Sequence, residues 1–436
     1  MQDATHDTLD ALRRGDLAGA RTLRLPAAGL TVLPPEIFGL TDTLEVLDLS
    51  GNALTALPDD LGRLTRLQVL FCSGNPFATL PPVLGDCRAL SQVGFRGCGL
   101  AEVPGEALPP RLRWLTLTDN RIAHLPDALG HRPRLRKLML SGNRLRSLPD
   151  SLAGCDDLEL IRLAANRLDA LPAWLPALPA LAWTSWAGNA FEGDAPRASA
   201  ALVPFADLDA GALLGEGTSG RVHRALWRPG GTAPPRPVAL KLFKGTMTSD
   251  GLPEREMEAC LAAGAHPNLT GALGRITGHP DGTDGLLMPL LPPDRRVLAG
   301  PPSLASCSRD VYDPALRLAP AALLRLVRGL AAGLAHLHAR GLLHGDVYGH
   351  NILWDAATGE AVLSDFGAAS VLPDGPPGVA LQRVEVRAFG LLIGEVLERA
   401  PADFPEAAAL RDLARACVQA EVGARPAMAE VVRAVG

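Results

Sequence analysis

Leucines recur along the first half of the chain in the pattern LxxLxL, which is followed by a polar marker, further apolar positions and a proline. The pattern is clearest at Leu44, as LEVLDLSGNALTALP, and returns at Leu67 as LQVLFCSGNPFATLP. Side chains of a strand alternate between its two faces, so each LxxLxL run predicts one short strand. The polar markers, 22 or 23 residues apart, are Asn52, Asn75, Cys98, Asn120, Asn143, Asn166 and Asn189.

Each repeating unit is too short to bury its own leucines, so a stable structure requires neighbouring units to stack. The pattern resembles the leucine-rich repeat family, whose template LxxLxLxxN/CxL has a period of about 20–29 residues. Cys98 is the allowed alternative to asparagine in that template. The resemblance implies an α/β solenoid of about eight units over residues 22–195, preceded by a helical cap at 1–21.

One face of the predicted strands is rich in apolar side chains. In each LxxLxL run, the second x and the residue between the last two leucines point to the concave side of the stack. Half of these positions are apolar and two are tryptophans, as on an exposed protein-binding surface. We expect a separate protein partner or substrate here; the alternative is packing against the second half of this chain. The expected contacts include Val69, Phe71, Trp114, Met139, Leu160 and Trp183.

The repeat ends after Phe191, where the small and polar residues EGDAPRASAA begin. Such a composition is typical of a linker, which we place at 196–206. Beyond it, VHRALW and VALK alternate as strands do, whereas apolar residues between Leu323 and Leu337 recur every three or four positions, as on a buried helix. Residues 207–436 are therefore expected to form a second domain.

The composition excludes several classes of protein. Lys and Arg number 42 against 47 Asp and Glu, so no basic surface suggests binding to nucleic acid or to an anionic membrane. Seven cysteines without a CxxC pair are typical of reduced thiols in a cytoplasmic protein. The uncharged stretch 170–191 contains three prolines and continues the repeat, so we expect no membrane span.

Glycines mark the start of the second half. Gly215, Gly217 and Gly220 form GxGxxG, with Val222 directly after it. At this spacing, backbone N–H groups can approach phosphate oxygens closely, because no Cβ intervenes. A dinucleotide-binding fold would continue with a helix, but a strand pattern follows here and leads to Lys241 in VALK. The chain has only three lysines, so a lysine at this position is unexpected by chance.

The motifs from GxGxxG to the C-terminus resemble, in order and spacing, those of protein kinases. The resemblance implies a bilobal α+β fold that binds ATP and Mg²⁺. By the same resemblance, Lys241 holds the α- and β-phosphates and pairs with a glutamate of the expected helix 254–263. Glu256 fits the family pattern best, and Glu254 and Glu258 are the alternatives.

The stretch HGDVYGHN at 344–351 resembles the kinase catalytic loop HRDxxxxN, and SDFG follows it. The resemblance implies that Asp346 accepts the proton of the substrate hydroxyl or orients that hydroxyl. Asn351 and Asp365 would bind Mg²⁺, with Phe366 packed beneath. The histidines just upstream of this stretch do not share one helix face, so they predict no metal site.

Two residues of this stretch depart from the family pattern. Gly345 replaces the arginine of HRD, which in the family contacts a phosphate on the activation segment; we therefore expect control that does not need that phosphate. Tyr348 stands where serine/threonine kinases have a lysine, and His350 stands where tyrosine kinases often have an arginine. These residues leave open whether serine/threonine or tyrosine is the preferred acceptor.

The region after SDFG is also unusual. Only residues 368–384 separate it from an expected helix at 384–398, in which Glu385 takes the position of a family aspartate. No APE motif fits between them, so the usual partner of Arg425 is missing. An insertion at 292–318 follows the expected hinge strand and could supply a different ledge for the substrate.

We therefore expect a multidomain chain, a leucine-rich-repeat solenoid followed by a kinase fold. Its expected activity is transfer of the γ-phosphate of ATP to a protein hydroxyl, serine or threonine being favoured, in cytoplasmic signalling. The alternative is a nucleotide-binding pseudokinase scaffold, because the activation segment is reduced and the catalytic-loop lysine is absent. A ligase of the bacterial-effector type would need a nucleophilic cysteine, and no cysteine of the second half supports one.

Overall fold

The structure is a computed structural model, and packing divides the chain into two units. The first unit comprises Met1–Ala180 with Asn189–Phe191, and the second comprises Leu181–Gly188 with Glu192–Gly436. The residues that the structure describes are 2–192, 201–217, 219–231, 234–245, 247–248 and 250–436.

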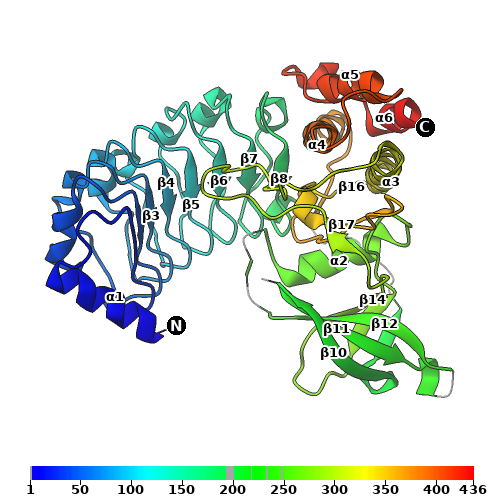
Figure 1. The fold of residues 1–436 in the computed structure, drawn as a ribbon, viewed down its shortest axis with the longest axis horizontal. Coiled ribbons are helices and arrows are strands. Elements are labelled where there is room, and N and C mark those ends of the chain that lie inside the picture. The colour runs from blue at the N-terminus through cyan, green and yellow to red at the C-terminus, as the bar shows by residue number, and fades with distance from the viewer. Residues whose placement is uncertain (1, 193–200, 218, 232–233, 246, 249) are drawn as a thin grey trace. The chain divides into compact units, whose positions relative to one another are not determined.

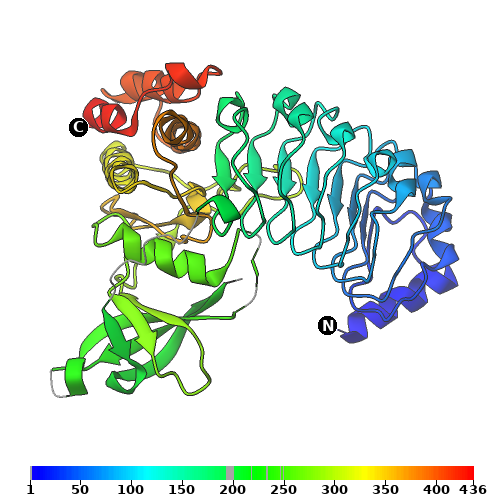
Figure 2. The same ribbon diagram turned by 180° about the vertical axis from the view of Figure 1, so that it is seen from behind.

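The first unit consists of helix α1 (Gln2–Arg14) and a series of short parallel strands. Figures 1 and 2 show the strands side by side in chain order, with α1 at the N-terminal end of the series. Every strand has three residues, as the LxxLxL runs predict. The strands are β1 (Thr22–Arg24), β2 (Val46–Asp48), β3 (Val69–Phe71), β4 (Gln92–Gly94), β5 (Trp114–Thr116), β6 (Lys137–Met139) and β7 (Leu160–Arg162).

Short 3-10 turns return the chain from each strand to the next. Most begin at or near a proline of the repeat, whose fixed φ suits the first position of such a turn. In the first unit they are η1 (Pro35–Leu40), η2 (Leu61–Arg63), η3 (Pro82–Asp86), η4 (Gly105–Ala107), η5 (Asp127–Leu129), η6 (Asp150–Gly154), η7 (Leu175–Ala177) and η8 (Ala190–Glu192); the last residue of η8 already belongs to the second unit.

The polar markers are buried and connect neighbouring repeats by hydrogen bonds. The Nδ2 atom of Asn75 donates to the carbonyl oxygens of Leu49 (2.9 Å) and Cys72 (2.8 Å). Its Oδ1 atom accepts from the N–H of Leu54 at 2.9 Å. An asparagine side chain offers both donors and an acceptor, so one residue satisfies backbone groups of two repeats. This explains why the marker recurs once per unit.

The second unit begins with a six-stranded sheet in the order β10-β11-β12-β14-β13-β9. Its core contains Val203, Leu240 and Leu287, all buried. In both views, helix α2 (Pro253–Ala263) lies between this sheet and the later helices (Figures 1 and 2). The strands are β9 (Leu202–Pro204), β10 (Leu208–Glu216), β11 (Gly220–Trp227), β12 (Arg236–Phe243), β13 (Gly274–Thr277) and β14 (Gly285–Pro289).

The rest of the second unit is mainly helical. The long buried helix expected before the catalytic loop is α3 (Pro320–Ala339). Other helices are α4 (Pro376–Leu397), α5 (Ala407–Cys417), α6 (Met428–Val435) and the 3-10 turns η9 (Phe205–Asp207), η10 (Pro229–Gly231), η11 (Gly349–Asn351) and η12 (Val422–Ala424). Short strands are β8 (Trp183–Ser185), β15 (Arg296–Val297), β16 (Leu342–Leu343), β17 (Ile352–Trp354), β18 (Ala361–Leu363) and β19 (Ser370–Val371).

Three boundaries differ from the expected ones. Strand β8 follows β7 in the order of the repeat sheet, as the repeat pattern predicts, but packing groups residues 181–188 with the second unit. The expected linker at 196–206 lies partly outside the described residues. Its later part contains β9, which pairs with β13 and thus belongs to the sheet of the second unit. Helix α4 begins at Pro376, eight residues before the expected 384, so the segment after SDFG is shorter than the sequence indicated.

Candidate active site

A cavity of about 620 Å³ lies beneath the glycine-rich turn that joins β10 to β11. The N–H of Gly217 donates to the carbonyl oxygen of Gly220 at 2.9 Å, which closes the turn. A Cβ added to Gly220 would meet the carbonyl oxygen of Leu242 at 2.4 Å, so packing requires that glycine. The residues that line the cavity include Gly215, Gly217, Gly220, Val222, Ala239, Lys241, Glu256, Cys260, Met288, Leu353, Ser364, Asp365 and Phe366.

The other two glycines of the motif have a different environment. A Cβ added to Gly215 or Gly217 would meet no atom of the protein within 4 Å. Neither residue has a positive φ, so the backbone conformation does not require glycine there either. What their missing side chains leave open is space along the cavity wall, where backbone N–H groups can approach a ligand closely.

Lys241 projects from β12 into the same cavity. The register pairs it with Val222 on one side and Leu286 on the other, in the middle of the sheet. Its Nζ atom forms an ion pair with Glu256 of α2. Burial alone would lower the pKa of Lys241, but the negative charges of Glu256 and Asp365 outweigh burial and raise it. The amine is therefore held as a cation inside the cavity.

The structure distinguishes among the three glutamates of the expected helix. Glu256 is buried and contacts Lys241. Glu258 instead pairs with Arg255 at 2.9 Å, and Glu254 is exposed. Among the three, Glu256 is the one whose side chain reaches the lysine, because the helix turns the positions two residues away toward other faces.

The catalytic-loop residues come together through one short hairpin. Strand β17 pairs with β18 so that Ile352 lies opposite Leu363, which places Asn351 beside Ser364. The N–H of Ser364 donates to the carbonyl oxygen of Asn351 at 2.8 Å, and Asp365 follows directly. The Nδ2 atom of Asn351 donates to Oδ2 of Asp346 at 2.7 Å and to the backbone oxygen of Asp346 at 3.0 Å.

The donor set at this point fits a magnesium ion. Both N–H groups of the Asn351 amide are used by Asp346, so the amide oxygen is the atom that can bind a cation. Asp365 is exposed, lines the cavity and has a φ of 61°, a conformation that aspartate tolerates better than most residues. A carboxylate and an amide oxygen are ligands that Mg²⁺ prefers. Within the described residues, no group of three His, Cys, Asp or Glu side chains forms a further candidate metal site.

Buried side chains hold the backbone of the catalytic loop. The Nδ1 atom of His344 accepts the N–H of Asp346 at 3.3 Å, and its Nε2 atom therefore donates to the carbonyl oxygen of Ser364 at 3.1 Å. Its ring faces Phe366, with 5.1 Å between the ring centroids. Burial lowers the pKa of His344, despite the nearby negative charges of Glu385, Asp346 and Asp365. The histidine thus connects the two motifs as a neutral side chain.

Glu385 of α4 contacts the same loop from the other side. Its Oε1 atom accepts the N–H of Gly345 at 2.6 Å, and its Oε2 atom lies 2.8 Å from Nε2 of His338. The expected position of Glu385, that of a family aspartate, is therefore used to bind the catalytic-loop backbone. His336 contacts the carbonyl oxygen of Ala263 instead, so the two histidines have separate roles.

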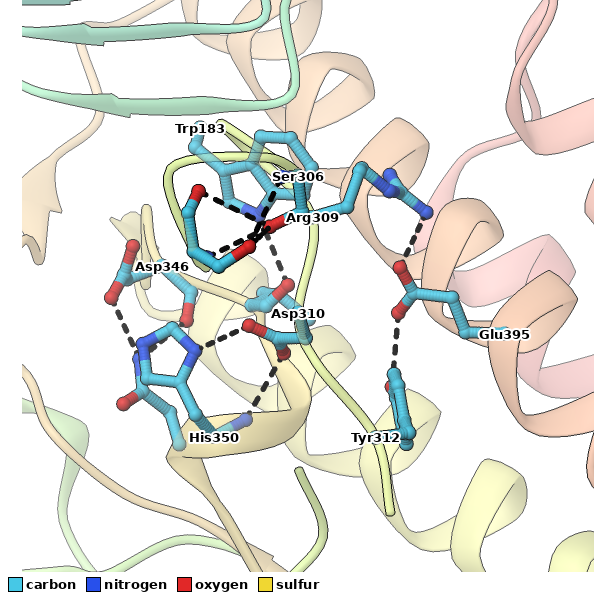
Figure 3. Close-up of polar contacts among 11 residues, drawn as sticks. Trp183, Ser306, Arg309, Asp310, Tyr312, Asp346, His350 and Glu395 are labelled. Carbon is cyan, nitrogen blue, oxygen red and sulfur yellow. Dashed lines mark hydrogen bonds and ion pairs between the residues drawn. The ribbon is translucent and has the colours of Figure 1, made fainter. Parts of the chain in front are cut away.

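The insertion at 292–318 packs on the catalytic loop, and periodicity gave no sign of this contact. Figure 3 shows Asp310 accepting two hydrogen bonds from His350, one from its backbone N–H at 3.1 Å and one from its ring at 2.7 Å. Arg309 and Tyr312 both contact Glu395 of α4. Burial would lower the pKa of His350, but the bond to Asp310 and the charge of Asp346 outweigh burial and raise it.

The apolar concave positions are less exposed than expected. Val69, Met139 and Leu160 are buried, and Phe71 and Trp114 are half-buried. Neighbouring strands bring the side chains of one face together, so they cover one another. The rings of Phe71 and Trp114 meet edge to face, with 6.4 Å between their centroids, and the amine of Lys137 lies 4.3 Å from the centroid of Trp114.

Two further expectations need correction or completion. Trp183, expected on a partner-binding face, packs within the second unit against Tyr348, so for this residue the alternative of packing on the chain's own second half is correct. Arg425, whose usual glutamate partner is missing, donates to the backbone oxygens of Gln419 (2.8 Å) and Arg383 (3.2 Å). Burial lowers the pKa of Arg425 to about 10.

Each half of the chain matches a known protein family. Residues 19–77 and 110–168 match the leucine-rich repeat family, and residues 208–376 match the family of protein tyrosine and serine/threonine kinases. A leucine-rich-repeat protein of Leptospira interrogans is 28% identical in sequence, over 42% of this chain and 52% of that one, with a TM-score of 0.36. Among the described residues, none of the helices is both long and apolar enough to span a membrane.

The curated relatives are protein kinases. The serine/threonine-protein kinase PkaB of Streptomyces coelicolor is 31% identical over 171 residues, which is 37% of this chain and 36% of that protein. The human non-receptor tyrosine-protein kinase TNK1 is 33% identical over 174 residues, 38% of this chain and 23% of that protein. The chain thus spans only about a quarter to a third of the length of these relatives. The chain thus joins a region that matches the leucine-rich repeat family to a region that matches the protein kinase family.

Proposed function

We propose that this chain is an ATP-dependent protein kinase that transfers the γ-phosphate to a hydroxyl group of a protein, with serine or threonine as the preferred acceptor. The observation that carries the proposal is that Lys241 and Asp365 line one cavity. The pair formed by Asp346 and Asn351 is joined to Ser364, the residue before Asp365, by a backbone hydrogen bond. Phosphoryl transfer depends mainly on positioning and charge neutralisation, and these residues supply both.

Each residue has a role that follows from its contacts. Lys241, fixed by Glu256, contributes a positive charge for the phosphates of ATP. Asn351 and Asp365 would hold Mg²⁺, which when bound neutralises the charge that develops on the transferred group. The carboxylate of Asp346 is oriented by the Asn351 amide and would accept the proton of the substrate hydroxyl or align that hydroxyl.

The apolar residues of the cavity support a nucleotide over a smaller phosphate compound. Val222 and Ala239 of the sheet and Leu353 of β17 line the same cavity as the glycine-rich turn. Ligand pockets of several hundred Å³ with apolar walls and a few polar groups are typical of cofactor sites. A base between these side chains would place the phosphates beside Lys241.

We further propose that the repeats bind a protein partner or substrate and that the protein acts in the cytoplasm. The half-buried pair Phe71 and Trp114, together with Lys137, supports the first point, because aromatic and cationic side chains often anchor protein interfaces. All seven cysteines are free, which supports a reducing compartment.

The test is phosphate incorporation by the full chain from labelled ATP with Mg²⁺, using casein and a glutamate–tyrosine copolymer as generic acceptors. Wild-type protein should label casein, and Asp346→Asn should reduce the rate by at least about 10²-fold, since a positioned base contributes that much or more. Preferential labelling of the copolymer would make the enzyme a tyrosine kinase. Thermal stabilisation by ATP and Mg²⁺ without labelling of either acceptor would favour the pseudokinase scaffold instead.

A further inference from the structure

Eight residues that belong by sequence to the last leucine-rich repeat, 181–188, pack as a part of the second unit. Because this unit contains the candidate active site, we call it the catalytic unit. Within this segment, Trp183, Ser185 and Trp186 each form a hydrogen bond with a different part of that unit. The three parts are the catalytic loop, the loop before the glutamate-bearing helix α2, and the strand that follows SDFG. We call residues 181–188 the docking segment.

Trp183 contacts the catalytic loop next to the proposed base. Its indole N–H donates to the carbonyl oxygen of Val347 at 3.0 Å. Its ring stacks on Tyr348 with 4.3 Å between centroids and 7° between planes. On the insertion, the guanidinium of Arg309 lies 5.6 Å from the centroid of the Trp183 ring (Figure 3). The tryptophan is buried and thereby fixes the backbone that carries Asp346.

Trp186 and Ser185 contact two further segments. The backbone N–H of Trp186 donates to Oγ of Ser370 at 3.0 Å, and its indole N–H donates to the carbonyl oxygen of Val371 at 3.1 Å. Both partners belong to β19, which begins four residues after Phe366. The Oγ atom of Ser185 donates to the carbonyl oxygen of Asp250 at 3.1 Å, three residues before α2 begins.

The docking segment also explains why the catalytic loop carries a glycine at 345. Gly345 has a φ of 75°, and a Cβ added to it would lie 2.3 Å from the carbonyl oxygen of Thr184 and 2.8 Å from that of Ala368. Both are backbone atoms, which cannot move aside as a flexible side chain can. Any side chain at this position is therefore incompatible with the docked arrangement.

The segment after SDFG offers few sites for regulatory phosphorylation. Between Phe366 and the start of α4, the one residue with a hydroxyl group is Ser370. Ser370 is buried, its Oγ atom accepts the N–H of Trp186, and it donates to the carbonyl oxygen of Ala368 at 3.2 Å. A phosphate on this atom would need the docking segment to leave.

We propose that the docking segment is a positioning element of the kinase site, which holds the catalytic loop and β19 in their working arrangement without any phosphorylation of the activation segment. This inference rests on the proposed kinase activity and adds its regulation. Trp183 and Trp186 are positioning residues, because they act through Val347, Tyr348 and β19 rather than on a substrate.

The contacts favour support over blockage. Trp183 bonds to a backbone oxygen of the catalytic loop and not to the carboxylate of Asp346. None of the cavity-lining residues comes from the docking segment. The Lys241–Glu256 ion pair is formed while the segment is docked. The docking segment therefore does not enter the nucleotide cavity and does not bond to the carboxylate of the proposed base.

The experiment compares four full-length variants with wild type by steady-state kinetics on casein. We expect Trp183→Ala and Trp186→Ala each to lower kcat at least about tenfold, with KM for ATP within about twofold, since the misplaced loop affects chemistry more than nucleotide binding. Trp183→Phe keeps the stacked ring and should recover most of the activity. Trp174→Ala, at the residue directly before η7 in the first unit, is the matched control and should leave kcat unchanged.

Three further measurements make the outcome decisive. Hydrogen exchange on the full chain should show faster exchange of peptides covering 342–351 and 368–375 in the two alanine variants and not in Trp174→Ala. Ser370→Ala should keep at least about half of the wild-type kcat, because only the two hydrogen bonds of its hydroxyl are lost and no phosphate is needed. Intact mass of the active wild-type protein should show no phosphate on Ser370.

Failure of the inference can be told apart from failure of the proposed function. If wild-type protein labels no acceptor, the kinase proposal fails. If wild type is active and both tryptophan variants keep full kcat with unchanged exchange, the positioning role is refuted. A rise in kcat in these variants would also overturn it, because the docking segment would then restrain the enzyme rather than support it.

Discussion

The two units of this protein hold their buried polar groups in different ways. In the repeats, Asn75 bonds to carbonyls 3 and 26 residues away, and Asn143 and Asn166 use the same separations. In the catalytic unit, Glu385 reaches back 40 residues to Gly345 and Trp186 reaches 185 residues to Val371. Regular contacts therefore stabilise one unit as a stack, whereas the other depends on a few contacts that occur only once.

This difference predicts that single changes should damage the two units in different ways. A change in the catalytic unit should abolish chemistry and leave the fold intact where the side chain is exposed. A change of a buried repeat residue should lower stability and leave chemistry intact. The four predictions below test this contrast, beginning with the largest expected effect.

Asp365→Asn should give the largest effect, and on activity alone. Asparagine tolerates the φ of 61° at this exposed position, so the fold should keep its melting temperature within about 1 °C. Losing the carboxylate removes the charge proposed to hold Mg²⁺, and we expect kcat to fall by at least about 10²–10³-fold. Phosphate incorporation and calorimetry on the same sample measure both. Activity above about a tenth of wild type would contradict the assigned role.

Asn120→Ala should affect stability alone. The Asn120 amide accepts the N–H groups of Leu100 (2.9 Å) and Cys98 (3.1 Å) and donates to the carbonyls of Phe95 and Leu117. Leaving these buried groups without the amide should lower the free energy of unfolding by about 2–4 kcal/mol.

The neighbouring exposed residue provides the control for that variant. Arg121→Ala should change the free energy of unfolding by less than about 0.5 kcal/mol, as surface substitutions usually do. Urea unfolding of both variants and kcat below the transition are the measurements. A large loss of kcat in folded Asn120→Ala would show that the contrast between the units is wrong.

Two glycines of equivalent turns should respond differently to alanine. At Gly85 in η3, an added Cβ would lie 1.9 Å from the carbonyl oxygen of Glu106 in the next repeat. At Gly154 in η6, it would meet nothing within 4 Å. We expect Gly85→Ala to destabilise by about 1–3 kcal/mol through overpacking. Gly154→Ala should be neutral or stabilising by up to about 1 kcal/mol, and equal melting temperatures would contradict the stacking geometry.

The smallest effect concerns pH. Burial lowers the pKa of His344, so the folded protein binds a proton there less readily than the unfolded chain does. The unfolded chain therefore takes up more protons as the pH falls through about 6.5, and stability decreases by up to about 1.4 kcal/mol per pH unit below that value. The contribution is fully present at higher pH.

The measurement is the free energy of unfolding between pH 8 and pH 5.5 for wild type and His344→Asn. The variant has no group that titrates at this position, so its stability should depend less steeply on pH over this range. Identical slopes would mean that the imidazole at 344 titrates in the folded state as it does in the unfolded chain.

The sequence was sufficient for the repeats because their contacts are local. A period of 22 or 23 residues, with one apolar pattern per unit, already determines which residues form strands and which are buried. It did not predict that Val69 and Met139 would be buried rather than exposed. Side chains of one face cover one another when strands stack, and a single strand pattern cannot show this.

The sequence was less informative about the catalytic unit. Motif spacing named Lys241, Asp346, Asn351 and Asp365, because each lies within a short run of characteristic residues. It left the choice of glutamate open, and it gave no reason for Gly345. That reason lies in a backbone oxygen 161 residues earlier, at Thr184, and no local pattern can reveal a contact of this separation.

The docking segment has a consequence for how such a protein can be assembled by recombination. The match to the kinase family begins at residue 208, so a gene fusion at that boundary would appear to transfer a complete enzyme. Such a fusion would omit Trp183 and Trp186. Its catalytic loop would also lack the Thr184 backbone against which Gly345 packs. Leucine-rich repeats from another protein could replace these only if they ended in the same pair of indoles, so we expect the repeats and the kinase-like domain to be inherited together.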